Sequence, residues 1–377
     1  MSIFTNARIV TRHEVYTGTV SVTRGVITAV EPGPTASRAA LDLEGDYLLP
    51  GAVELHTDVL ERHAMPRPGV QWPEVAAVVS SDSQLIGAGI TTVLDSLAVG
   101  YLVDSGQRPR NPRSLVDAIH RSRSAGILRA DHFLHLRCEV STEVVADDFA
   151  PFATDPLLRL VSLMDHSPGQ RQFVSIDKYR EYNQGRYGLS DAQMDDLIRT
   201  RLLERSRYAK LHREAITAFC RKHGLTTASH DDATAAHVDE AVRAGAAIAE
   251  FPTTLEAAKA ARDHGLAVTA GAPNLVRGRS HSGNVSAADL ATRGLLDILS
   301  SDYMPVSILH GVFLLHLRHG LPLADAVAMV SLTPARRVGF DDRGEIAVGK
   351  RADLARVRLA DDLPTVRGVW CEGDRVA

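Results

Sequence analysis

Residues that could bind a metal ion occur in several short segments of this sequence, and the first segment is His56-Thr57-Asp58. An apolar run around Pro50-Gly51 precedes it, which is the pattern of a strand buried on both faces. Side chains two positions apart on a strand share one face, so His56 and Asp58 can reach the same ion. The triplet alone is weak evidence, because a solvated strand end has the same pattern. The prediction therefore depends on further ligands at other strand ends.

Further side chains with metal-binding chemistry lie at the ends of later apolar runs. They are Glu139, His166, His230 and Asp302. Each has an ordinary alternative: Glu139 as a solvated strand end, the histidines as core rings bonded to backbone, and Asp302 as a helix N-cap. Together with His56 and Asp58, they form a donor set that suits one or two ions of Zn²⁺, Mn²⁺ or Fe²⁺. A carboxylate such as Glu139 can bridge two ions.

These residues follow short apolar runs that alternate with helical stretches. Besides the run ending at His56, the runs cover residues 89–97, 132–140, 157–166, 225–232, 246–251, 266–273 and 295–303. Helices are expected between them, for example at 114–125, 233–244, 254–264 and 306–319. Eight such units predict a TIM (β/α)8 barrel, whose active site lies at the C-terminal ends of the strands. A doubly wound open sheet is the alternative, but no G-x-G-x-x-G motif follows the first strand.

Both ends of the chain have a different pattern, that of short strands bounded by Gly, Asn or Pro. Neither end is long enough to form a stable unit alone. We therefore predict an α/β protein in two parts. Residues 1–47 and 344–377 build one small β-sandwich domain, and residues 48–343 form the barrel.

Composition limits the classes of protein to which this chain can belong. Its 377 residues with 45% hydrophobic content can bury a large core, and no apolar stretch is long enough to span a membrane. The net charge of −4 excludes a generally basic nucleic-acid-binding protein. Three cysteines without C-x-x-C spacing argue against a disulfide framework or a thiolate zinc site. We expect a protein without a membrane span, located in a reducing cytoplasm.

Two groups of basic side chains follow predicted strands in this acidic protein. They are Arg62, His63 and Arg67 after the strand ending at His56, and Arg277, Arg279 and His281 after the strand at 266–273. Guanidinium groups suit phosphate oxygens, so the two loops could bind one anionic substrate at the barrel mouth. The alternative is that these charged loops are simply solvated.

A long excursion, residues 167–189, follows His166. Long loops beside an active site often act as lids, and Gln170 and Gln172 are close enough to His166 in the sequence to contact a substrate. The distal half could equally be a surface loop or an oligomer contact. If it is an oligomer contact, we expect a homodimer.

Longer motifs resemble the amidohydrolase superfamily across almost the whole chain. This resemblance is carried by LLPGAVELHTD, AGITTVLD, SHDD, SSDY and LTPARRVGFDDRGEIAVGKRADLARV, and a β-domain split between the termini is a feature of that superfamily. Within it, the chain is similar to the triphosphate diphosphatases of the carbon–phosphorus lyase pathway. That similarity is carried by HTDVLERHAMPRPGVQWP, MDHSPGQRQF and GAPNLVRGRSHSGN.

The resemblance implies a small-molecule substrate, α-D-ribose 1-methylphosphonate 5-triphosphate, which is hydrolysed to the 5-phosphate and pyrophosphate in phosphonate catabolism. Asp58 stands where the superfamily usually has a second histidine, and no clear strand-end lysine is present for carbamylation. Glu139 would take the bridging place of that lysine. Asp302, at the last strand, is the candidate catalytic base. The alternatives are hydrolysis of an amide or cyclic imide with the same metal-activated water, or a metal-free scaffold that has lost its chemistry.

Overall fold

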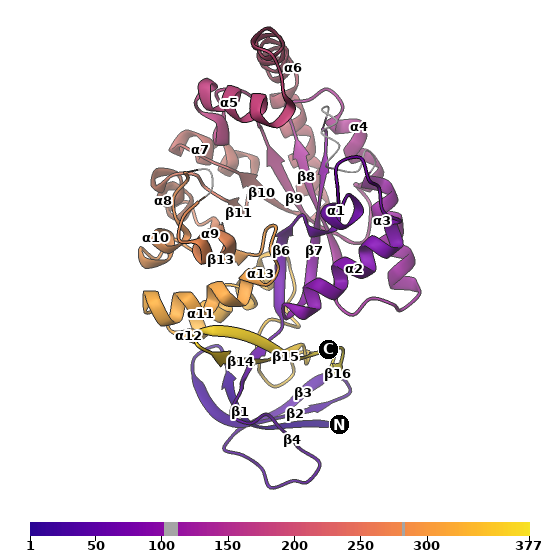
Figure 1. Cartoon of the computed structure of the whole chain (residues 1–377), viewed down its shortest axis with the longest axis vertical. Helices are drawn as coiled ribbons and strands as arrows, with labels where there is room; N and C mark the ends of the chain where they lie inside the picture. Colours follow the sequence, from indigo (N-terminus) through magenta and orange to yellow (C-terminus); the bar gives the residue numbers. More distant parts are fainter. Residues whose placement is uncertain (102–111, 281–282) are drawn as a thin grey trace.

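The chain was analysed as a computed structural model that describes residues 1–101, 112–280 and 283–377. In these ranges one of two eight-stranded sheets is parallel, with its strands in the order β13-β12-β11-β10-β9-β8-β7-β6 (Figure 1). The strands are β6 (Ala52–Thr57), β7 (Ile90–Val99), β8 (Asp131–Glu139), β9 (Leu158–Met164), β10 (Thr226–His230), β11 (Ile248–Glu250), β12 (Ala267–Gly271) and β13 (Ile298–Ser300). Each overlaps one of the predicted apolar runs, so the predicted barrel is confirmed.

The outer strands of this sheet, β6 and β13, approach each other and nearly close the barrel. Thr57 forms a parallel bridge with Asp302, and its hydroxyl donates a hydrogen bond of 2.7 Å to the Asp302 carbonyl. The Asp302 N–H donates to the His56 carbonyl at 3.2 Å. Glu54, which is fully buried, accepts hydrogen bonds from the backbone N–H of His56 at 2.8 Å and of Ser301 at 2.6 Å. These bonds between β6 and the end of β13 therefore fix the position of His56 relative to Asp302.

Helices pack around the barrel (Figure 1). The longer ones are α2 (Glu74–Gly87), α3 (Pro112–Ser124), α7 (Ala235–Ala244), α8 (Leu255–Asp263) and α11 (Ser307–His319), and the last four confirm the expected helices. The shorter ones are α1 (Val59–Ala64), α4 (Val145–Phe149), α9 (Ala272–Arg277), α10 (Ala287–Thr292), α12 (Leu323–Ala328) and α13 (Leu332–Arg337), with a 3₁₀ turn η1 (Ala150–Phe152). Local sequence sets their bounds. In α7, the Thr234 hydroxyl caps the His237 N–H, and Gly245 ends the helix at a φ of 85°, which glycine adopts without strain.

Both ends of the chain contribute to a second sheet, as predicted. Its order is β16-β15-β14-β5-β1-β2-β3, with β4 paired to β1. The strands are β1 (Ser2–Val10), β2 (Val15–Thr23), β3 (Val26–Pro32), β4 (Leu41–Asp42), β5 (Tyr47–Pro50), β14 (Leu354–Ala360), β15 (Leu363–Cys371) and β16 (Asp374–Arg375). Phe4 and Trp370, from opposite ends of the chain, pack with ring centroids 4.8 Å apart. Residues 48–50, expected at the start of the barrel, lie in this sheet because β5 pairs with β1 and β14.

The segment 167–189 is not the extended loop that the sequence suggested. It contains a 3₁₀ turn, η2 (Arg171–Phe173), and the helix α5 (Ile176–Tyr187), and it leads into the 33-residue helix α6 (Asp191–His223). Figure 1 shows α5 and α6 at the end of the barrel opposite the small sheet. Among the described residues, no helix has the length and apolar character needed to cross a membrane.

Candidate active site

A cavity of about 330 Å³ opens at the C-terminal ends of the barrel strands. The structure brings five of the six predicted metal-binding residues to its wall, and these are His56, Glu139, His166, His230 and Asp302. The sixth, Asp58, follows β6 directly, and its negative charge helps to raise the pKa of Asp302. Side chains of α5 and α6, including Tyr179 and Arg201, complete the wall on the outer side. The parallel strands thus collect residues that are far apart in the sequence.

His56 is held in one orientation by a carboxylate that the sequence analysis did not identify. Its Nδ1 donates to Glu250 Oε1 at 3.1 Å, and the other oxygen of Glu250 accepts from the Ser162 hydroxyl. Burial lowers the pKa of His56 well below its usual value, and the positive charge of Arg137 adds to that effect. His56 is therefore a neutral ring with Nδ1 protonated, so Nε2 remains as a lone-pair donor for a metal.

Glu139 and His166 form a close pair at the ends of β8 and β9. The Nδ1 of His166 donates to Glu139 Oε2 at 2.7 Å, and the His166 backbone N–H lies 3.1 Å from Oε1. The Ser141 hydroxyl also donates to Oε1 at 2.6 Å. Burial alone would raise the pKa of Glu139, but the charge and hydrogen bonds of His166 and the Ser141 bond outweigh it and lower that pKa to about 2. Glu139 is therefore an anion in the cavity wall.

His230 lies between these groups and has unused hydrogen-bonding capacity. Neither of its buried ring nitrogens makes a hydrogen bond within the described ranges, although Nδ1 is 3.0 Å from Asp231 Oδ2. A buried ring nitrogen that makes no hydrogen bond, such as Nε2, is unfavourable unless a ligand meets it. His230 also belongs to two groups whose donor atoms lie within 4.8 Å of one another: with His56 and Glu250, and with His166 and Asp231.

The last strand presents Asp302 to the same cavity. Burial raises the pKa of Asp302 to about 7, and the negative charge of Asp58 adds to this rise. One oxygen of Asp58, Oδ1, is itself buried without a hydrogen-bond partner in the described part of the chain. Asp302 has a φ of 51°, an uncommon value that the bonds between β6 and β13 hold in place. Imidazoles and carboxylates arranged in this way can bind a divalent cation and provide a nearby base.

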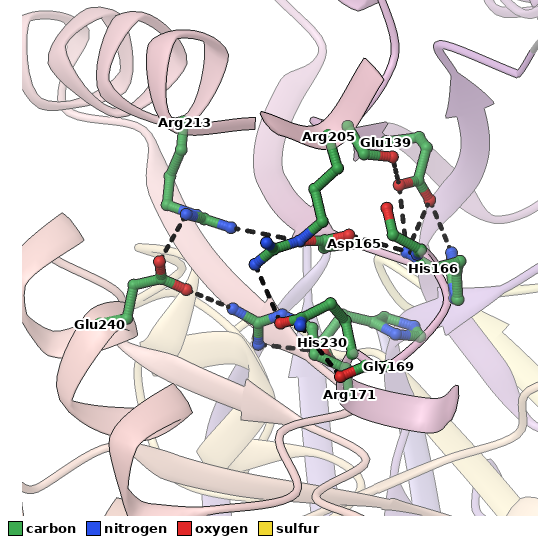
Figure 2. Close-up of polar contacts among 12 residues, drawn as sticks. Glu139, Asp165, His166, Gly169, Arg171, Arg205, Arg213, His230 and Glu240 are labelled. Atoms are coloured by element: carbon green, nitrogen blue, oxygen red, sulfur yellow. Dashed lines mark hydrogen bonds and ion pairs between the residues drawn. The ribbon is translucent and has the colours of Figure 1, made fainter. Parts of the chain in front are cut away.

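A buried network of arginines and carboxylates supports the loop that carries His166 (Figure 2). Arg171 in η2 binds Asp232, which follows β10, and reaches Glu240 of α7 at 2.9 Å. Arg213 of α6 also binds Glu240, at 2.6 Å. Because Arg171 joins the loop after β9 to the loop after β10, it fixes the backbone next to both His166 and His230.

Arg205 of α6 also binds the loop that carries His166 (Figure 2). It donates to Asp165 Oδ2 and to the side-chain oxygen of Gln170, both at 2.9 Å. The Gln170 amide nitrogen donates to the Gly169 carbonyl at 2.9 Å. Gln170, predicted as a substrate contact, is therefore engaged in the scaffold and does not line the cavity, whereas Gln172 does.

The two predicted basic loops occupy different positions. In the second loop, Arg277 lines the cavity, Arg279 lines an adjoining hollow that also includes Arg277, and His281 lies outside the described residues. The side chains of the first loop are not among those that line the cavity: Arg62 donates to the Tyr303 carbonyl at 2.5 Å, His63 contacts Gln84 at 2.9 Å, and Arg67 is exposed. The reason is that α1, which carries Arg62 and His63, packs against α2.

Three residues of the site were missed in the sequence. Asp231 directly follows His230, Glu250 is the last residue of β11, and Arg137 lies two positions before Glu139 on β8. Strand periodicity places Arg137 and Glu139 on one face, so that signal was present. Nothing in the sequence pairs Glu250 with His56, 194 positions away.

The chain is similar to known proteins in sequence. Residues 175–376 match the model of the amidohydrolase family. The chain is 46% identical over 376 residues to the α-D-ribose 1-methylphosphonate 5-triphosphate diphosphatase of Escherichia coli (strain K12), covering 99% of this chain and 100% of that protein.

Solved structures support the fold. Two N-acetylglucosamine-6-phosphate deacetylases, from Pasteurella multocida and Mycobacterium smegmatis, superpose with a TM-score of 0.64 each, at 15% and 19% identity. Each alignment covers 100% of this chain, with 99% of the first structure and 100% of the second. At such identities the likeness concerns the fold alone. The family match and the full-length relative show that this chain belongs to the amidohydrolase family.

Proposed function

We propose that this chain hydrolyses α-D-ribose 1-methylphosphonate 5-triphosphate to the 5-phosphate and pyrophosphate. The observation that carries the proposal is the 46% identity to a diphosphatase of that name along the whole chain. The cavity supports it, since a base, metal-binding side chains and the guanidinium of Arg277 meet at one wall. A diffusible substrate of this kind fits an enzyme of the cytoplasm.

The proposed cofactor is one or two divalent cations. The Nε2 of His230 and the Oδ1 of Asp58 fit such an ion, because a cation would satisfy buried ligand atoms that have no hydrogen bond within the described ranges. The holding residues would be His56, Asp58, Glu139, His166 and His230. Zn²⁺ is our first choice, and Mn²⁺ or Fe²⁺ would suit the same donors. Such an ion supplies Lewis acidity, which lowers the pKa of water and polarises a phosphoryl oxygen.

In this mechanism the protein's own residues orient the reactants and move one proton. A carboxylate oxygen of Asp302 accepts a proton from the attacking water. Glu250 orients His56 and fixes its tautomer, since its carboxylate accepts the Nδ1 hydrogen bond, while burial keeps the ring neutral. Arg277 binds phosphate oxygens, and the side chains from α5 and α6 limit access of bulk water to the cavity.

The alternative activity is hydrolysis of an amide or cyclic imide, and a substrate panel separates the two. Metal-loaded enzyme should release pyrophosphate from the ribosyl triphosphate and leave amides and imides intact. In ¹⁸O-labelled water, attack at the α-phosphorus, which we favour, would place label in the ribosyl phosphate and leave pyrophosphate unlabelled. Arg277→Ala should lower kcat/KM for the triphosphate about ten- to a hundredfold, since a charge-assisted contact is lost. Amide or imide turnover without pyrophosphate release, unaffected by Arg277→Ala, would support the alternative.

A further inference from the structure

The guanidinium of Arg137 belongs to the inner wall of the cavity. Arg137 lies on β8 two residues before Glu139, so both side chains share a face. In the sheet it pairs with Ser162 of β9, whose hydroxyl reaches Glu250 inside the barrel. The residue is only 7% exposed, and it lines the cavity together with Glu139 and Asp302. Arg137 therefore faces the barrel interior, one layer below the proposed metal ligands.

Arg137 differs from the other buried arginines in having no counter-ion. The described residues include four buried arginines, which are Arg137, Arg171, Arg213 and Arg343. Three of them have carboxylate partners: Asp232 for Arg171, Glu240 for Arg213 and Asp131 for Arg343. Arg137 makes no hydrogen bond or ion pair within the described ranges, and its Nε is buried without an acceptor. A buried cation left in this way is costly unless an anion binds to it.

The surroundings of Arg137 indicate where that anion would bind. Its positive charge acts on His56 and on Asp302, so the guanidinium lies near both. Neither Asp302 nor Glu139 is an ion-pair partner of Arg137, however, which leaves its N–H groups available to a ligand. A guanidinium offers two parallel donors that match two oxygens of a phosphoryl group, which a water molecule cannot match.

We propose that Arg137 binds the phosphoryl group under attack, at the inner end of the cavity beside Asp302. This inference rests on the proposed function, because it needs a phosphoryl substrate. Contact with the reacting group should strengthen as negative charge develops on the phosphoryl oxygens, so Arg137 should contribute more to kcat than to KM. In the absence of an anion, the unpaired charge destabilises the fold, a cost that is offset when the substrate binds.

The test compares metal-loaded wild type with Arg137→Gln and Arg137→Lys, using inorganic phosphate in calorimetry as the probe for the position of the attacked phosphoryl group. Loss of one charge-assisted contact should weaken the phosphate Kd about ten- to a hundredfold in Arg137→Gln, with partial recovery in Arg137→Lys. Without an anion, Arg137→Gln should keep or raise the wild-type Tm and keep the metal content. Arg343→Gln is the matched control, a buried arginine paired with Asp131 at 2.9 Å. It should lower Tm and leave the phosphate Kd unchanged.

Two results would overturn the inference. One is an unchanged phosphate Kd together with unchanged kcat for the ribosyl triphosphate in Arg137→Gln. The other is a marked fall in Tm and in metal content in Arg137→Gln that accompanies the loss of phosphate affinity, because that would show a structural role. Phosphate binding also separates this inference from the proposed function. A wild type that hydrolyses only amides would remove the proposed function, while the dependence of phosphate affinity on Arg137 would still decide the inference.

Discussion

Glu139 is a charged side chain in the wall of the proposed metal site. It accepts from the ring and the backbone of His166, and its low pKa keeps it charged. Glu139→Gln removes that charge and replaces one acceptor by a donor, so we expect lower metal content and lower activity. Metal analysis after dialysis measures the first, and Glu143→Gln, an exposed neighbour, is the control. Full metal retention with full turnover would exclude Glu139 as a ligand.

Asp302 should behave differently from Glu139, because its proposed task is proton transfer. Burial and the charge of Asp58 raise the pKa of Asp302 to about 7, near the value at which a base works best at neutral pH. A cation bound beside it would lower that pKa, since it favours the carboxylate. Asp302→Asn should retain most of the metal and lower kcat by roughly 10² to 10⁴. An unchanged kcat would show that another group accepts the proton.

Residue types at strand ends were predictable from the sequence, whereas their partners were not. His56, His166 and Asp302 stand at the ends of periodic apolar runs, and the barrel brings them together. The Glu250 that orients His56 comes from a strand of only three residues, too short for a clear pattern. Arg137 lies inside a strand, where an apolar residue is expected, and its proposed role is inferred from the absence of an ion-pair partner among the described residues.

At the scale of elements, Arg171 links the turn η2 to α7 and to the loop after β10. Arg171→Met leaves the buried Asp232 without its counter-ion and Glu240 with Arg213 alone, so we expect a loss of about 3 to 5 kcal/mol in the free energy of unfolding. Arg180→Met is the control, since its pair with Asp195 lies at the surface, where water screens the attraction, so its loss should change stability little. Urea denaturation of both variants measures the difference. Equal losses would mean that the network is not a support for the His166 loop.

The helix α5 shows why the segment after His166 was mistaken for a loop. Its sequence, IDKYREYNQGRY, is polar around most of its circumference and lacks the apolar stripe of a core-facing helix. Local signals define it instead: the Ser175 hydroxyl accepts from the Lys178 N–H, and Gly188 ends the helix at a φ of 64°. Packing of Phe173, Tyr179 and neighbouring side chains against α6 completes its stabilisation. Those contacts exist only in the folded chain.

At the scale of the whole molecule, stability should depend on pH through a fully buried histidine. His132 on β8 contacts Asp95 of β7 at 2.7 Å and Asp82 of α2 at 3.4 Å. Burial alone would lower the pKa of His132, but these two carboxylates outweigh it and raise the pKa to about 9. The folded-state pKa is thus above the unfolded value of about 6.5. The stability contribution is therefore complete below about pH 6.5 and is lost as pH rises towards 9.

The matching experiment compares unfolding free energies of wild type and His132→Gln at several pH values. The two proteins should differ most near pH 6 and least near pH 10, with a change on the order of 3 kcal/mol between those limits. His13→Gln, at an exposed position, should follow wild type throughout. A wild-type advantage that stays constant from pH 6 to pH 10 would mean that the histidine does not titrate in this range.

The two-part plan of the chain was visible in the sequence, but the connection between the parts was not. Asp131, at the start of β8, accepts from Arg343 at 2.9 Å and from Arg351 at 2.6 Å, just before the chain enters β14. The Gly51 N–H donates to the Asp353 carbonyl at 2.8 Å where the chain leaves β5. Such contacts join residues hundreds of positions apart, so the periodicity of the local sequence does not predict them.

The shared sheet of the two termini has a consequence for how the protein is made. On the ribosome, β5 emerges roughly 300 residues before β14, its partner in the sheet. At synthesis rates of about 5 to 20 residues per second, β5 waits about 15 to 60 s with one edge unpaired. An open edge of this kind can pair with another nascent chain. Pairing with β14, which is synthesised much later, therefore protects β5 from aggregation.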